Sequence, residues 1–130
     1  MKIALTKTID DQVLENIFVT AIEGGSNYWY FLSDEAIAII RGYVPDSDDP
    51  YLSTAIYKAI KLGAVIPIND AENEDDVIGQ LSINTFATRL QKMYDDGNGD
   101  ALEAEIREEG DAGTSDIVFQ YLAMGEIVFG

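Results

Sequence analysis

Residues 8–25, TIDDQVLENIFVTAIEGG, carry the pattern that is most decisive for the fold. Thr8 is a suitable helix N-cap, and acidic residues follow it in the first turn, where the helix dipole favours negative charge. Apolar residues then recur at intervals of three and four, the period of one helix face: Val13, Leu14, Ile17, Phe18, Ala21 and Ile22. Gly24 and Gly25 end the pattern as helix C-caps commonly do. The stretch therefore predicts an amphipathic helix.

Short segments with strand character lie on both sides of this helix. Alternating or β-branched apolar residues predict strands in residues 1–7, 65–68, 77–81 and 126–129. The two middle segments are joined by an acidic connection and predict a hairpin. Pro67 places its first arm at a sheet edge, because proline has no amide donor. The aromatic run 28–32 fits either a strand or a packed connection.

Five further helices are predicted from apolar spacing and from their end residues. They cover residues 34–41, 52–62, 83–95, 101–109 and 115–124. Three of them have a hydroxyl N-cap, and three end at a glycine: the caps are Ser33, Ser82 and Thr114, and the glycines are Gly42, Gly63 and Gly125. Helices outnumber strands. We therefore expect one α+β domain over residues 1–130, with several helices packed on a small, mostly antiparallel sheet.

The composition excludes many kinds of chemistry. The chain has 24 Asp and Glu against 8 Lys and Arg, a formal net charge of −16, and neither histidine nor cysteine. Ser-His-Asp and Cys-His catalysis and thiolate metal sites are therefore impossible or improbable. No spacing singles out a pair of carboxylates for acid-base catalysis, so we do not favour an enzyme. We expect no cofactor.

Calcium binding by a helix-loop-helix site is also excluded. Twelve-residue loops starting at Asp46, Asp70 or Asp96 lack both the glycine at position 6 and the glutamate at position 12. We therefore assign no metal site, and only a looser divalent-ion site in the acidic clusters stays open. No stretch approaches the roughly 18 apolar residues of a membrane span. The amino-terminal residues also lack the apolar core of a signal peptide. These features predict a cytoplasmic protein.

Besides the high net negative charge, the chain has a dense group of carboxylates between residues 95 and 111. The candidate partner-binding residues here are Asp95, Asp96, Asp100, Glu103, Glu105, Glu108 and Glu109. One interpretation is an ordinary solvated surface. The other is a surface that imitates the phosphates of a nucleic acid and occupies the basic groove of a protein. The net charge disfavours direct binding of nucleic acid or of an anionic membrane.

Two segments form a candidate ligand site. In residues 23–29, EGGSNYW, two glycines precede polar and aromatic side chains, and Asp116 and Gln120 share a helical face because they are four residues apart. The candidate ligand-binding residues are Glu23, Asn27, Tyr28, Trp29, Thr114, Asp116 and Gln120. A structural interpretation stays open for both segments: core aromatics after a helix end, and a helix start with a solvent-facing glutamine. The glycines follow a helix, so this is not a phosphate-binding loop.

The same two segments carry a resemblance. EGGSNYW at 23–29, with DIVFQ at 116–120 leading into GEIVFG at 125–130, resembles a family of small acidic proteins encoded by bacteriophages and prophages. The resemblance implies an origin in a mobile element and a bacterial host cell, but no particular activity. Gly113 stands where the family pattern has an acidic residue.

These observations lead to two functional hypotheses. The first is a non-enzymatic accessory protein that binds a basic surface of a host protein through its acidic face. A nucleic-acid mimic or counter-defence inhibitor is the more specific form of this hypothesis. The alternative is a module that binds a small nucleotide-like ligand at Tyr28 and Trp29. The oligomeric state stays open, since the strand predicted at 126–129 could pair with another chain.

Overall fold

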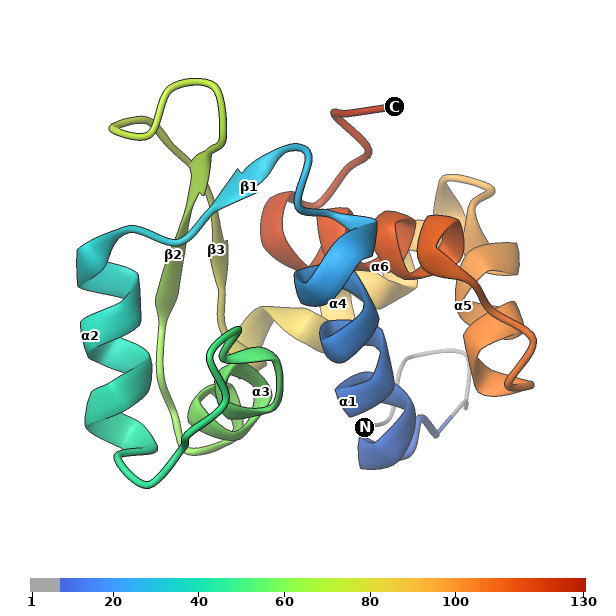
Figure 1. Cartoon of the computed structure of the whole chain (residues 1–130). Helices are drawn as coiled ribbons and strands as arrows, with labels where there is room; N and C mark the ends of the chain where they lie inside the picture. Colours follow the sequence, from blue (N-terminus) through green and yellow to red (C-terminus); the bar gives the residue numbers. More distant parts are fainter. Residues whose placement is uncertain (1–7) are drawn as a thin grey trace.

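The small sheet lies between the helix Asp34–Tyr43 on one side and the larger group of helices on the other (Figure 1). The computed structural model describes residues 8–130, so the strand predicted at residues 1–7 lies outside the described residues. The elements are α1 (Asp11–Thr20), the π-helical turn η1 (Ala21–Gly25), β1 (Tyr30–Phe31), α2 (Asp34–Tyr43), α3 (Ser53–Lys61), β2 (Ile66–Asp70), β3 (Val77–Leu81), α4 (Ile83–Asp95), α5 (Gly99–Ile106) and α6 (Ala112–Met124). The predicted α+β fold class is confirmed.

The sheet has three antiparallel strands in the order β1-β2-β3. The predicted hairpin is confirmed, with Ile66 opposite Leu81. The prediction that Pro67 marks an edge strand is wrong, because β2 lies in the middle of the sheet. The reason is that β1 pairs only with Asn69 and Asp70. The part of β2 that contains the proline has a strand on one side only, so its missing donor interrupts no ladder on the other side.

Residues 126–129 do not form the predicted strand, and the described sheet contains no fourth strand. Their backbone instead lies against the side chain of Gln120, whose Oε1 accepts hydrogen bonds from the amides of Val128 and Phe129, both at 2.9 Å. A side-chain amide thus satisfies groups that a neighbouring strand would otherwise satisfy.

Several helix ends differ from the predicted ones. The N-cap of α1 is Asp10 rather than Thr8, and α2 continues past Gly42. The last helix begins at Ala112, not at residue 115, because Asp111 and Thr114 form a reciprocal capping box. The caps predicted at Ser33 and Ser82 are confirmed.

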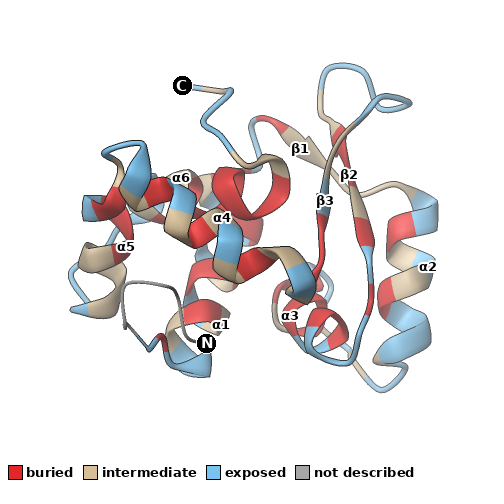
Figure 2. Cartoon of the chain, turned by 180° about the vertical axis from the view of Figure 1, so that it is seen from behind, coloured by how far each residue is buried: buried red, intermediate tan, exposed pale blue. Residues whose placement is uncertain are grey.

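The core surrounds α6, which α1, α4, α5 and η1 all contact. Figure 2 shows buried residues over most of this helix. Phe18 stacks on Tyr57 and Phe86 and meets Phe119 of α6 edge-on. Polar residues of α6 are therefore carried into the interior. Among residues 8–130, no helix combines the length and apolar character needed to cross a membrane.

Candidate functional site

A buried carboxylate joins the two segments that the sequence singled out. Asp116 is only 8% exposed. Its Oδ1 accepts hydrogen bonds from the Ser26 hydroxyl at 2.7 Å and from Trp29 Nε1 at 2.8 Å. Its Oδ2 accepts them from the Tyr28 hydroxyl at 2.6 Å and from Gln120 Nε2 at 3.2 Å. Four donors thus compensate the burial of the charge. We call these five residues the Asp116 cluster.

The turn η1 brings the cluster together by passing very close to the start of α6. A Cβ on Gly25 would lie 2.8 Å from the carbonyl oxygen of Ala112. Any residue other than glycine at this position would therefore force the backbone to shift. Ser26 follows directly and points its hydroxyl at Asp116. The sequence predicted the glycines as a helix end. In the structure, Gly25 also permits this close approach.

The two aromatic side chains of the cluster differ in exposure. Trp29 is 1% exposed, and its ring stacks on Phe129 with centroids 5.3 Å apart. Tyr28 is 51% exposed. Two effects raise the pKa of Tyr28 to about 12. The larger is partial burial of the hydroxyl, and the smaller is its hydrogen bond to the Asp116 carboxylate. The predicted stacking face on Trp29 is therefore covered by the chain itself, which favours the interpretation of this ring as part of the core.

The remaining predicted ligand residues lie outside the cluster. Glu23 and Asn27 are exposed, and neither forms a described hydrogen bond to Asp116. The N-cap of α6 is Asp111 and not the predicted Thr114, which lies in the first turn of α6 and donates its hydroxyl to Glu105 at 2.7 Å. Ser26 and Phe129 were not predicted as site residues from the sequence. The only signal for Ser26 was its place within the EGGSNYW segment, and nothing indicated that Phe129 would fold back.

The predicted partner-binding carboxylates lie within α5 or directly before and after it, at the opposite end of the molecule from α2 (Figure 1). Three of them also serve the fold. Asp96 accepts from Lys92 Nζ at 2.8 Å and from the Tyr121 hydroxyl at 2.9 Å, and these hydrogen bonds lower the pKa of Asp96. Glu103 accepts from the Tyr94 hydroxyl at 2.6 Å. Glu105 accepts from the hydroxyl groups of Thr114 and Ser115.

The other four carboxylates are exposed and leave most of their oxygens to solvent. We call them the exposed α5 set: Asp95, Asp100, Glu108 and Glu109. Arg107 is the only Lys or Arg between residues 93 and 130, and its Nε lies 3.4 Å from Glu109. Among residues 8–130, this end of the molecule therefore presents many carboxylates and few compensating cations.

The C-terminal end of α5 departs from the pattern of the other helices. After α3 and α4 and at the C-cap of α6, the left-handed position is occupied by Gly63 (φ 108°), Gly97 (φ 85°) and Gly125 (φ 78°). At the end of α5 it is occupied by Glu108, with φ 59°. A side chain costs free energy in this conformation, and the helix dipole disfavours negative charge at a C-terminus. Helix stability alone does not account for a glutamate at this position.

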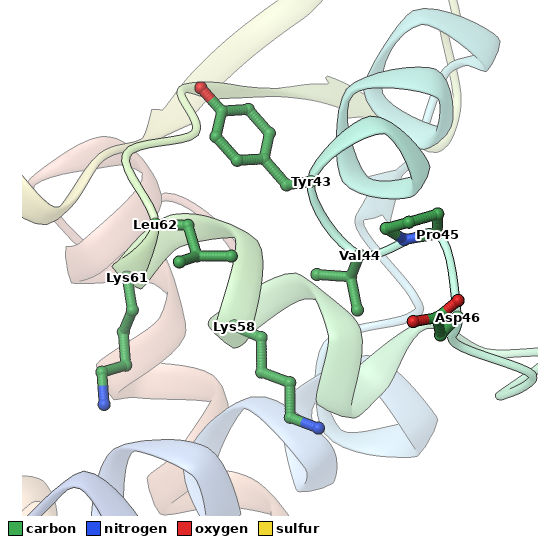
Figure 3. A pocket seen from close by; sticks show the side chains of 7 residues that line it. All are labelled: Tyr43, Val44, Pro45, Asp46, Lys58, Lys61 and Leu62. Carbon is green, nitrogen blue, oxygen red and sulfur yellow. The ribbon is translucent and has the colours of Figure 1, made fainter.

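A separate hollow lies between the C-terminal ends of α2 and α3 (Figure 3). It has a volume of about 350 Å³ and is lined by Tyr43, Val44, Pro45, Asp46, Lys58, Lys61 and Leu62. Both lysines belong to the last turn of α3, where cations stabilise a helix. Lys61 also lies 2.6 Å from Asp11. No residue of either predicted site lines this hollow.

The described residues contain no group of three or more carboxylates placed to hold a metal ion. Comparison of the chain with family models, with curated proteins and with solved structures gave no match.

Proposed function

We propose that the protein is a non-enzymatic accessory protein of a bacteriophage or prophage, and that it binds a basic surface of a host protein through the exposed α5 set. The more specific proposal is a nucleic-acid mimic that competes for the groove of a nucleic-acid-binding protein. A surface of this charge attracts a basic groove over a distance and releases counterions from both partners on contact.

The observation that carries this proposal is the end of α5. Glu103, Glu105, Glu108 and Glu109 all lie in or after its last turn, where their charges oppose the helix dipole. Glu108 adds the cost of a left-handed backbone. Natural sequences break local rules of stability mainly where function requires it. A carboxylate kept at such a position is better explained by binding than by folding.

The alternative ligand, a nucleotide-like molecule at Tyr28 and Trp29, has weaker support. The Trp29 ring is already stacked on Phe129, and all four donors around Asp116 are directed at that carboxylate. An anionic ligand would also meet the field of a chain with a net charge of −16.

The test is capture of partners from a nuclease-treated bacterial lysate with the tagged full-length protein, followed by elution in a salt gradient. We expect one nucleic-acid-binding protein to be retained at physiological salt and released at high salt. Added duplex DNA should displace it from the captured complex. The proposal is wrong if no protein is retained, or if the retained protein is neither released by high salt nor displaced by duplex DNA.

A further inference from the structure

Residues 126–130 of the chain itself bind to a site formed by Gln120 of α6 and by Trp29. Gln120 Oε1 accepts hydrogen bonds from the amides of Val128 and Phe129, and Gln120 Nε2 donates to the Phe129 carbonyl at 3.0 Å. The Phe129 ring lies flat on Trp29, with an angle of 10° between the two planes. The Gln120 side chain therefore forms hydrogen bonds with three backbone groups of the segment, and the Trp29 indole stacks on its one aromatic side chain.

Little else holds this segment in place. Ile127 is 41% exposed and Val128 is 52% exposed, and residues 126–130 belong to no described helix or strand. Gly125, with φ 78°, separates the segment from α6. Segments with few buried contacts and few hydrogen bonds open at the lowest free-energy cost. The site that residues 126–130 occupy is held in place, because Gln120 and Trp29 are both hydrogen-bonded to the buried Asp116.

We propose that Gln120 and Trp29 form a binding site for an extended peptide segment of a partner protein that carries an aromatic residue at the position of Phe129. Residues 126–130 occupy this site within the chain and compete with such a segment. The three hydrogen bonds to Gln120 involve backbone atoms only, so they tolerate any side chain except proline at the two donor positions. Specificity comes from the ring that stacks on Trp29.

Charge argues that the occupant comes from another protein and not from a second copy of this chain. Two copies each carry a formal net charge of −16, and exchange of identical segments would gain no new contact. A partner segment with a basic residue in place of Glu126 would be attracted instead. The proposal does not depend on the exposed α5 set, so the two can fail separately.

Trp29 is the only tryptophan in the chain, so its fluorescence reports on this site directly. The probe is the capped peptide Gly-Glu-Ile-Val-Phe-Gly, titrated into full-length wild type and into Phe129→Ala. Since the variant loses the intramolecular ring, we expect the peptide to bind it about ten-fold or more tightly than it binds wild type. A peptide with lysine in place of glutamate should bind tighter still at low salt.

Two further proteins control the experiment. Val128→Ala alters an exposed side chain and should behave as wild type. Val128→Pro removes the amide N–H that donates a hydrogen bond to Gln120 Oε1, and it keeps the Phe129 ring. This variant should also bind the peptide better than wild type does. The proposal is overturned if neither Phe129→Ala nor Val128→Pro gains peptide affinity, or if the peptide without its phenylalanine binds equally well. Sedimentation should show a monomer, and a segment-exchanged dimer would overturn the choice of another protein as the partner.

Discussion

At the scale of single residues, Glu108 and Asp116 show opposite uses of a carboxylate. Asp116 is buried, and four donors make it part of the core. Glu108 is exposed and sits in a left-handed conformation at a helix end. The first residue stabilises the fold through charge-assisted hydrogen bonds. The second carries a local cost, and we attribute its presence to binding.

The change Glu108→Gly separates stability from binding. We expect it to raise the free energy of unfolding by about 1 kcal/mol, because glycine adopts positive φ without the cost that a side chain adds. Glu108→Gln keeps the backbone strain and removes only the charge, so its gain should be smaller. Urea denaturation measures both variants. Equal stability of the two variants would contradict the account of strain, and unchanged capture of the partner by both would contradict the functional interpretation of Glu108.

At the scale of secondary structure, local signals were sufficient wherever the element depends on its own sequence. The caps Ser33 and Ser82 and the hairpin of residues 66–81 follow from local chemistry, and they were predicted. The strand at 126–129 failed because its apolar residues fit equally well against a side chain of α6. The same limit applies to the site. Spacing predicted that Asp116 and Gln120 share a helical face, but only tertiary packing decides that this face is buried.

The contact between β3 and α6 depends on the absence of a side chain. A Cβ on Gly79 would lie 2.7 Å from the carbonyl oxygen of Ala123, which is backbone and cannot rotate away. We expect Gly79→Ala to lower the free energy of unfolding by about 1–3 kcal/mol, the usual cost of overpacking. Gly42→Ala is the matched control, because it lies within α2 with open space around it and should stabilise that helix by about 1 kcal/mol. Thermal or urea unfolding of both variants decides. Tolerance of alanine at position 79 would mean that β3 and α6 are not packed this closely.

At the scale of the whole molecule, burial raises the pKa of several tyrosines and links stability to alkaline pH. Burial raises the pKa of Tyr30, which donates to the Ile22 carbonyl, to about 12 from an ordinary value of 10.0. The folded state therefore holds this proton more tightly than the unfolded state does. Its contribution to stability is complete below pH 10 and is lost as the pH rises through the folded pKa.

We therefore expect the urea midpoint of the wild-type protein to fall between pH 10 and pH 12. Tyr30→Phe removes one of the titrating groups responsible, so its midpoint should fall less over the same interval. Tyr51→Phe changes a side chain that is 61% exposed and serves as the control. The same pH dependence in both variants would show that Tyr30 does not carry the effect.

The central claim is that the position of the charge, and not its total, directs this protein to a partner. The most direct measurement compares the affinity of two variants for the captured host protein. One neutralises the exposed α5 set as Asp95→Asn, Asp100→Asn, Glu108→Gln and Glu109→Gln. The other neutralises the exposed loop between β2 and β3 as Glu72→Gln, Glu74→Gln, Asp75→Asn and Asp76→Asn.

Both variants lose four negative charges, so any effect of net charge alone is the same in each. We expect the dissociation constant to rise by about ten-fold or more for the variant of the exposed α5 set, and by a much smaller factor for the loop variant. Equal weakening by the two variants, or no weakening by the first, would contradict the claim that the end of α5 is the binding surface.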